Sequence, residues 1–147
     1  MVGNSRSGTT MMGRILGNNS DVVTFKELHF FGQLWTSGDE NNQLNRKESV
    51  KLFSRLLCIN KHGIFSQVDL HQFNSISETE LPYECVYALD IFKRFLEYSL
   101  KFKNHATISC DQTPRNVFYI QEILDNFPNA KIVNMVRDPR DVLLSQK

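Results

Sequence analysis

The sequence is short of several features that mark specialised classes of protein. Its three cysteines, Cys58, Cys85 and Cys110, are far apart and form no Cys-x-x-Cys pair, which argues against a disulfide framework and against a zinc site. The 17 basic side chains are balanced by 16 acidic ones, so no net field draws the protein to nucleic acid or to an anionic membrane. No apolar run approaches the roughly 20 residues that span a bilayer, and no signal peptide opens the chain. We therefore expect a soluble protein of a reducing compartment such as the cytoplasm, with no nucleic-acid partner and no transmembrane segment.

Glycine and proline are also scarce, with 7 and 4 residues among 147, which fits neither a collagen-like nor a disordered chain. Hydrophobic residues make up 41% of the sequence, which is enough to bury a core. We expect one domain over residues 1–147. The first predicted strand is pared to two apolar residues and the last predicted helix has barely begun, so we expect this domain to be incomplete at its C-terminus and at the start of its first strand.

The hydrophobic residues alternate between short runs and periodic segments. Runs rich in apolar and β-branched residues predict strands at 22–25, 107–110 and 132–136. Spacings of three and four residues predict helices at 11–16, 47–59, 86–102 and 117–127, while 60–80 has no clean period. Strands that alternate with helices predict an α/β fold with a parallel sheet between two helical layers. Ligands of such sheets bind beyond the carboxyl ends of the strands.

The loop at the first such end is rich in glycine, serine and threonine. Gly3 and Gly8 have the spacing of a Walker A loop, whose backbone N–H groups cradle a phosphate. Thr9 stands where that motif has its lysine, and Arg6 supplies a cation inside the loop instead. We expect a phosphate site that works with fixed cations rather than with Mg²⁺. The simpler alternative is a glycine turn that opens a helix.

The loop after the last predicted strand has the features of a second anion site. Arg137 ends that strand where an NTPase would place a metal-binding aspartate, and Arg140 lies in the first turn of the following helix. Arginine beside a helix N-terminus suits a phosphate group. The alternative is that Arg137 forms an exposed ion pair with Asp138 or Asp141. Two anion-binding loops at one sheet edge favour a nucleotide with phosphates at both ends.

Four segments resemble one known family in order along the chain. Residues 3–10 (GNSRSGTT) are similar to the 5′-phosphosulfate loop of sulfotransferases that use 3′-phosphoadenosine-5′-phosphosulfate (PAPS). Arg137, followed eight residues later by Ser145, resembles that family's 3′-phosphate motif. Residues 25–31 (FKELHFF) resemble the segment that carries the catalytic glutamate in the carbohydrate branch. Residues 111–116 (DQTPRN) resemble a Glu-Lys-Thr-Pro segment there, with Gln112 in place of the lysine.

The resemblance implies a P-loop-like three-layer α/β/α fold, here truncated, that moves a sulfuryl group from PAPS to a hydroxyl or amine acceptor. It implies Glu27 as the general base, with His29 as the second candidate, and Arg6 as the cation that stabilises the charge developing on the leaving oxygen. No metal ion is required for this chemistry. The residues expected to bind PAPS, or its product 3′-phosphoadenosine-5′-phosphate (PAP), are Arg6, Ser7, Gly8, Thr9, Thr10, Arg137 and Ser145.

The acceptor side is less well defined by the sequence. Gln112, Thr113 and Arg115 follow the third predicted strand and are expected to line the acceptor site. The acceptor itself stays open between a small molecule, a glycan, a lipid and a peptide.

Two other functions compete with this interpretation. One is a P-loop nucleotide kinase or NTPase, against which the missing Walker lysine and the missing strand-end aspartate argue. The other is a nucleotide-binding remnant without catalytic activity.

Overall fold

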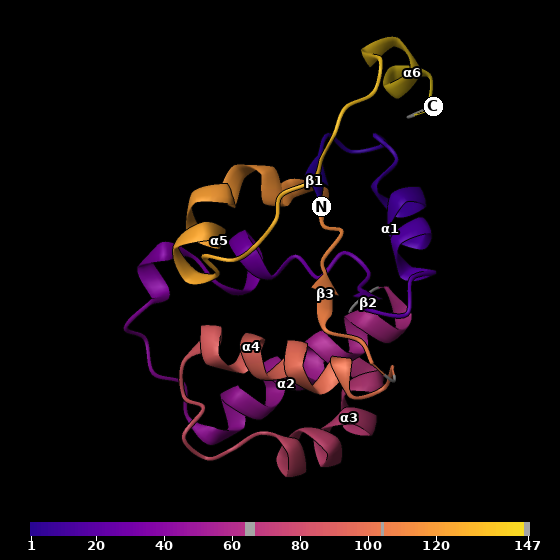
Figure 1. Ribbon diagram of the computed structural model, residues 1–147. Helices are drawn as coiled ribbons and strands as arrows, with labels where there is room; N and C mark the ends of the chain where they lie inside the picture. The colour runs from indigo at the N-terminus through magenta and orange to yellow at the C-terminus, as the bar shows by residue number, and fades with distance from the viewer. Residues whose placement is uncertain (64–66, 104, 146–147) are drawn as a thin grey trace.

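The computed structural model describes residues 1–63, 67–103 and 105–145 (Figure 1). Its strands are short and run parallel in two pairs. One pair joins β1 (Val2–Gly3) to β4 (Asn134–Met135), and the other joins β2 (Val22–Thr24) to β3 (Ile108–Cys110). The predicted α/β class with parallel strands is confirmed, although β4 is shorter than the run of residues 132–136 suggested.

The two strand pairs are joined end to end. The amino group of Met1, at the start of β1, donates a hydrogen bond to the carbonyl group of Asp111, directly after β3. The amide of Phe25 donates to the carbonyl oxygen of Cys110 at 3.0 Å, so the pairing of β2 with β3 extends one residue beyond both strands. The loops after β2 and β3 therefore leave the sheet side by side.

Helices surround the strands. The α-helices are α1 (Thr9–Gly17), α2 (Arg46–His62), α3 (Gln67–Glu80), α4 (Ala88–Leu100), α5 (Ile120–Asn126) and α6 (Pro139–Leu144). Shorter helical turns are η1 (Phe30–Leu34), η2 (Ser37–Asp39) and η3 (Pro114–Tyr119). Helix α1 packs on β2, α4 packs on β3, and α2 packs against both α3 and α4. Figure 1 shows α1 and α5 on opposite sides of the strands.

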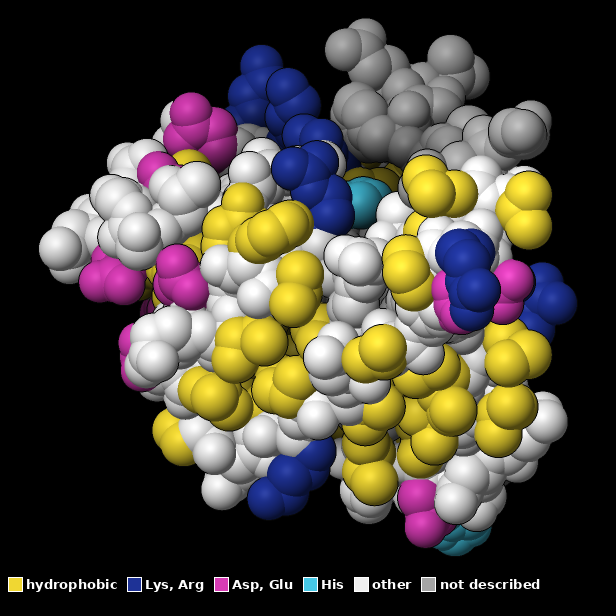
Figure 2. All heavy atoms as spheres, turned by 90° about the horizontal axis from the view of Figure 1, so that it is seen from above, with side chains coloured by type: hydrophobic (Ala, Val, Ile, Leu, Met, Phe, Trp, Pro, Cys, Tyr) yellow, Lys and Arg dark blue, Asp and Glu magenta, His cyan; other side chains and the backbone are white. Residues whose placement is uncertain are grey.

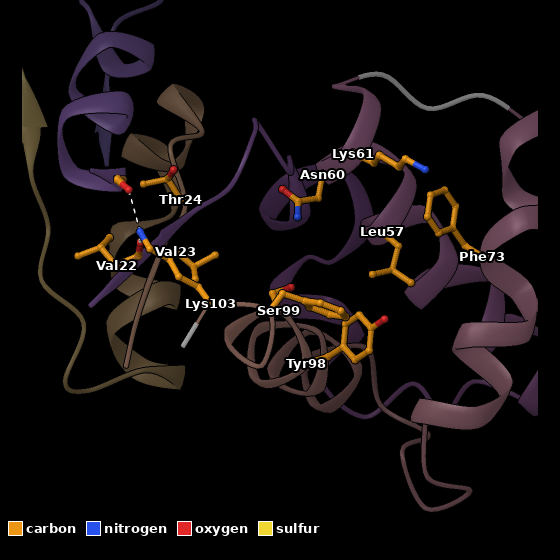
Figure 3. Close-up of a pocket in the computed structure, with 12 residues that line it drawn as sticks. Val22, Val23, Thr24, Leu57, Asn60, Lys61, Phe73, Tyr98, Ser99 and Lys103 are labelled. Atoms are coloured by element: carbon orange, nitrogen blue, oxygen red, sulfur yellow. Dashed lines mark hydrogen bonds between the residues drawn. The ribbon is translucent and has the colours of Figure 1, made fainter. Parts of the chain in front are cut away.

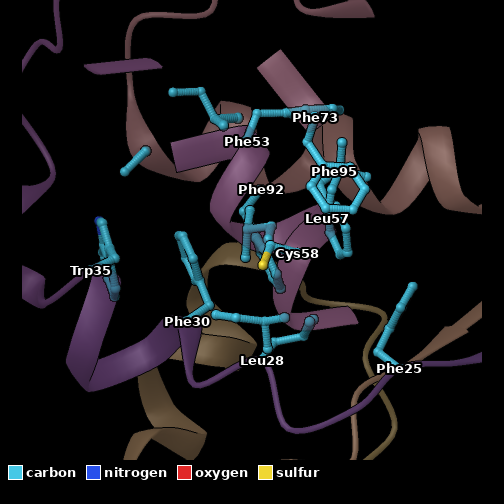
Figure 4. Packing of buried hydrophobic residues seen from close by; sticks show 14 of the residues in the cluster. Phe25, Leu28, Phe30, Trp35, Phe53, Leu57, Cys58, Phe73, Phe92 and Phe95 are labelled. Atoms are coloured by element: carbon cyan, nitrogen blue, oxygen red, sulfur yellow. The ribbon is translucent and has the colours of Figure 1, made fainter. Parts of the chain in front are cut away.

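An aromatic core lies between β2 and the helices α2 and α4 (Figure 4). The rings of Phe30 and Phe92 stack with centroids 4.1 Å apart, and those of Phe25 and Phe95 lie 5.4 Å apart. Phe25, Leu28 and Phe30 are all at most 1% exposed. Because three residues of the segment after β2 are buried in this core, the side chains between them are held at the surface of the loop.

Helix α3 was not predicted, because its buried face is partly made of polar residues. Phe73 and Ser77 turn this face toward α2, where the Ser77 hydroxyl lies 2.7 Å from that of Ser54. Ser77 also donates to the carbonyl oxygen of Phe73 at 2.8 Å. Buried serines that satisfy their hydroxyl groups inside the helix pair leave no hydrophobic period in the sequence.

Helix α6 projects from the rest of the chain (Figure 1) and carries exposed apolar side chains. Leu143 and Leu144 are 65% and 68% exposed, and Val136 before the helix is 84% exposed. Hydrophobic side chains cover a broad part of the face seen in Figure 2. Among the described residues, no helix combines the length and the apolar character needed to cross a membrane.

Candidate functional site

The loop between β1 and α1, which the sequence predicts to cradle a phosphate, turns sharply before the helix. Arg6 and Gly8 have φ values of 67° and 100°, in the left-handed region, and the amide of Ser7 donates to the carbonyl oxygen of Asn4 at 3.1 Å. A side-chain carbon on Gly3 would lie 2.5 Å from the carbonyl oxygen of Met135, so only glycine permits this contact between β1 and β4. Backbone that turns in this way before a helix directs several N–H groups toward one point.

The loop after β4 approaches this cradle through one side chain. The Nη1 atom of Arg137 donates to the carbonyl oxygen of Arg6 at 3.3 Å. Its Nε atom lies 3.9 Å from the Asp141 carboxylate, a long and exposed ion pair. The ion pair that the sequence offered as the alternative for Arg137 is therefore present but long, and the guanidinium group stays exposed at the surface.

Arg140 differs from Arg137 because a neighbouring carboxylate already binds it. Asp138 accepts hydrogen bonds from Arg140 Nε at 3.1 Å and from Arg140 Nη2 at 2.7 Å. These bonds lower the pKa of Asp138 and raise that of Arg140. Asp138 also caps α6 by accepting from the amide of Arg140 at 2.9 Å, as its position before a proline predicts.

The two candidate bases lie together in the loop after β2. The Nε2 atom of His29 is 3.4 Å from the Oε2 atom of Glu27, with the two side chains 30% and 45% exposed. His29 has a left-handed backbone, with φ 50° and ψ 31°. Its amide donates to the hydroxyl of Thr113 at 3.3 Å. The loop after β2 is therefore attached to the loop after β3, and both candidate bases remain accessible to solvent.

The loop after β3 is organised by Asp111, which the sequence analysis did not single out. Its Oδ1 atom accepts from the amide of Thr113 at 3.0 Å and from the Thr113 hydroxyl at 2.7 Å. Its Oδ2 atom accepts from the side-chain amide of Asn116 at 2.9 Å. Burial raises the pKa of the Asp111 carboxyl, while these hydrogen bonds act in the opposite direction. The Asp-x-Thr pattern at a strand end is the sequence signal that could have identified this turn.

The sequence matches one known protein family over its whole length. The model of the sulfotransferase family matches residues 1–147. The chain belongs to the sulfotransferase family. Its class of reaction is therefore sulfuryl transfer, in agreement with the resemblance of the four segments. Neither a search of curated proteins nor a search of solved structures gives a significant match.

The remaining predicted site residues differ in their exposure and in their contacts. Arg115 is exposed, whereas Thr113 is 0% exposed and its hydroxyl is engaged within the loop. The amide group of Gln112 lies against Gly13 of α1, where a side-chain carbon would overlap it, and its oxygen has no hydrogen-bond partner among the described residues. Ser145 caps the end of α6, where its hydroxyl donates to the carbonyl oxygen of Val142 at 2.9 Å.

The sulfotransferase also has a cavity of about 560 Å³ beside β2, shown in Figure 3. It is lined by residues of β2 and of the helices α1 to α4, and by none of the predicted site residues. The amine of Lys103 at its border donates to the carbonyl oxygens of Gly17, Asn19 and Val22 at 2.6–2.9 Å. Within the described part of the chain, no three His, Cys, Asp or Glu side chains come together as metal ligands would.

Proposed function

We propose that this sulfotransferase moves a sulfuryl group from PAPS to a hydroxyl or amine acceptor, with Glu27 as the general base. The observation that supports this best is the hydrogen bond from Arg137 to the carbonyl oxygen of Arg6, because it brings together the two loops expected to bind anions. PAPS carries a phosphosulfate at one end of its ribose and a phosphate at the other. It is therefore a ligand that both loops can hold at once.

The donor side of the proposed reaction uses the cradle after β1. The N–H groups of Gly8, Thr9 and Thr10 bind the 5′-phosphosulfate, together with the Arg6 guanidinium group and the hydroxyl of Ser7, whose amide already donates to the carbonyl oxygen of Asn4. During transfer, negative charge grows on the oxygen that bridges phosphorus and sulfur. Fixed donors directed at that oxygen stabilise the transition state more than the ground state. Because these donors and Arg6 supply the positive potential, the step needs no metal ion.

The 3′-phosphate of the donor is assigned to the loop after β4. Arg137 supplies a charged donor whose partner Asp141 is distant at 3.9 Å, so the guanidinium group can bind a phosphate without losing a strong ion pair. Ser145 at the end of α6 keeps the lone pairs of its hydroxyl oxygen, and the hydroxyl can rotate to donate to the phosphate.

The acceptor side is assigned to the loop after β2. The acceptor oxygen or nitrogen forms a bond to sulfur, and the bond from sulfur to the bridging oxygen breaks. The electron pair of that bond stays on the 5′-phosphate of PAP, and the acceptor proton passes to the Glu27 carboxylate. Glu27 is about half exposed and lies three residues after the end of β2, in the loop that leaves the ligand edge. His29 is the alternative base, and Arg115 is the exposed candidate for acceptor contact.

Transfer of labelled sulfate from PAPS tests the proposal. The acceptors are a sugar, a lipid, a tyrosyl peptide and a phenol, each tried with Mg²⁺ and with EDTA. We expect labelled product and PAP in equal amounts, at rates that EDTA does not change. Hydrolysis of ATP that depends on Mg²⁺ would instead indicate a P-loop kinase or NTPase. Binding of PAP with no transfer to any acceptor would indicate a nucleotide-binding remnant.

A further inference from the structure

The backbone of His29 has a conformation that other contacts must hold. Its φ of 50° and ψ of 31° lie in the left-handed region, which a residue with a side chain adopts at a cost. Such a conformation persists only where the surrounding structure determines it. Leu28 and Phe30 on either side are 0% exposed, so the chain is anchored before and after His29.

Thr113 supplies the direct restraint on His29. Its hydroxyl group has a single proton, and this proton is directed to the carboxylate of Asp111 at 2.7 Å. The lone pairs of the hydroxyl are then free to accept the amide proton of His29, at an N···O distance of 3.3 Å. Thr113 is 0% exposed, so water does not compete for these bonds. By taking the hydroxyl proton, Asp111 orients the lone pairs of Thr113 toward the amide of His29.

The carboxylate of Asp111 is itself held at both of its oxygen atoms. Its second carboxylate oxygen accepts from the side chain of Asn116 at 2.9 Å, and Asn116 is 4% exposed. The amide of Thr113 closes the turn at 3.0 Å. A carboxylate fixed in this way acts as a rigid reference point for the loop after β2.

We propose that Asp111 and Thr113 are positioning residues for sulfuryl transfer, which hold the backbone of His29 so that its imidazole fixes the carboxylate of Glu27. This inference rests on the proposed role of Glu27. The imidazole Nε2 atom lies 3.4 Å from the Glu27 carboxylate. A glutamate at the surface otherwise samples several rotamers, and only some of them direct the carboxylate at an acceptor. The hydrogen bonds among Asp111, Thr113 and His29, together with the contact of His29 with Glu27, therefore raise the fraction of productive encounters.

Amide hydrogen exchange tests the restraint without any assay of activity. In the wild-type protein we expect the amide of His29 to be protected, although its loop is partly exposed. Thr113→Val has the same shape without the hydroxyl, and should speed exchange of this amide roughly 5- to 10-fold. Thr113→Ser keeps the hydroxyl and should stay near the wild-type rate. An unprotected His29 amide in the wild-type protein would overturn the proposal, and this measurement does not depend on whether Thr113→Val folds.

Steady-state kinetics test the consequence for turnover. Thr113→Val should lower kcat roughly 10- to 100-fold while the Kd for PAP is unchanged, because the nucleotide loops are not altered. Thr113→Ser should restore most of kcat. Asp111→Asn keeps an acceptor for Thr113. The buried Oδ1 atom of Asn116 has no partner among residues 1–63, 67–103 and 105–145, and Asn116 can turn its amide so that this atom accepts from the new side chain. We therefore expect Asp111→Asn to retain far more kcat than Asp111→Ala.

The two arms separate this inference from the proposed function. Equal loss of kcat in Thr113→Ser and Thr113→Val would show that the hydroxyl is not needed, and would overturn the positioning role. His29 exchange that is the same in Thr113→Val and wild type would overturn it as well. If the wild-type protein transfers no sulfate to any acceptor, the proposed function fails, and the exchange arm still decides whether Asp111 and Thr113 hold His29.

Discussion

The guanidinium group of Arg137 donates a hydrogen bond to the carbonyl oxygen of Arg6, 131 positions earlier in the sequence. This contact is possible because β1 and β4 pair in parallel, with Gly3 opposite Met135, so that the loops that follow them leave the sheet at the same edge. The two loops that resemble the phosphosulfate and 3′-phosphate motifs of sulfotransferases are thus joined by a direct contact.

Removing the Arg137 side chain should weaken the binding of PAP selectively. Arg137→Ala should cost about 1.5–3 kcal/mol of affinity for PAP, the usual contribution of a charge-assisted hydrogen bond, and should barely change the affinity for adenosine 5′-phosphate. Isothermal titration calorimetry of both nucleotides measures this difference. Arg140→Ala is the matched control, because Asp138 already pairs with that guanidinium group. Equal weakening of both nucleotides by Arg137→Ala would contradict the assignment of the 3′-phosphate.

Replacing the proposed general base should separate turnover from binding. Glu27→Gln should lower kcat by a factor of about 10²–10⁴, because the acceptor loses the group that takes its proton. The affinity for PAP should stay the same. Glu40→Gln, which changes an exposed carboxylate outside the site, serves as the control. If Glu27→Gln keeps a rate within severalfold of wild type, the base lies elsewhere, and His29 is the next residue to replace.

The Arg6 side chain should matter for both binding and rate. Arg6 has a φ of 67°, so Arg6→Gly removes the charge while suiting the left-handed backbone, and Arg6→Ala removes the charge without that relief. Both variants should bind PAP more weakly and also lose kcat, because the bridging oxygen carries more negative charge in the transition state than in bound PAPS. Titration of PAP and steady-state rates give the two quantities. A normal rate in Arg6→Gly would show that the backbone donors suffice.

The partly buried Asp111 should make stability depend on pH. Because burial raises the pKa of Asp111, the folded state holds this proton more tightly than the unfolded state does. Stability from this group is therefore present at low pH and is lost as the pH rises through the folded-state pKa. Urea unfolding of wild type and Asp111→Asn at a series of pH values isolates the effect. As the pH rises above about 4, the free energy of unfolding of wild type should fall relative to that of Asp111→Asn. A constant difference would contradict the prediction.

The aromatic core should contribute strongly to the stability of the loop that carries Glu27. Phe92 is 3% exposed and its ring stacks on that of Phe30, which follows His29 directly. Phe92→Ala should lower the free energy of unfolding by about 3–5 kcal/mol, because it leaves a cavity in a closely packed cluster. Phe92→Leu fills most of that space and should cost much less. Chemical denaturation of the two variants measures the difference, and a loss of under 1 kcal/mol in Phe92→Ala would show that the cluster is not tightly packed.

Much of the fold follows from patterns that are local in the sequence. The apolar spacing of residues 47–59 predicts α2. In the structure, a capping box between Asn45 and Glu48 marks where this helix begins. Gly3, Gly8 and Arg137 were identified because turns and strand ends require particular residue types at short spacings. Glu27 and His29 are two residues apart, so their proximity was also within reach of sequence analysis.

Contacts between distant segments were decided only by the tertiary structure. The sequence shows Asp111 and Thr113 as one polar turn, and it does not show that His29 lies 3.3 Å from the hydroxyl of Thr113. That contact depends on the register of β2 against β3, in which Thr24 lies opposite Cys110. Helix α3 likewise escaped prediction because buried hydroxyls of α2 and α3 satisfy each other. Local preferences determine which elements form, whereas the partner of each polar side chain depends on how those elements pack.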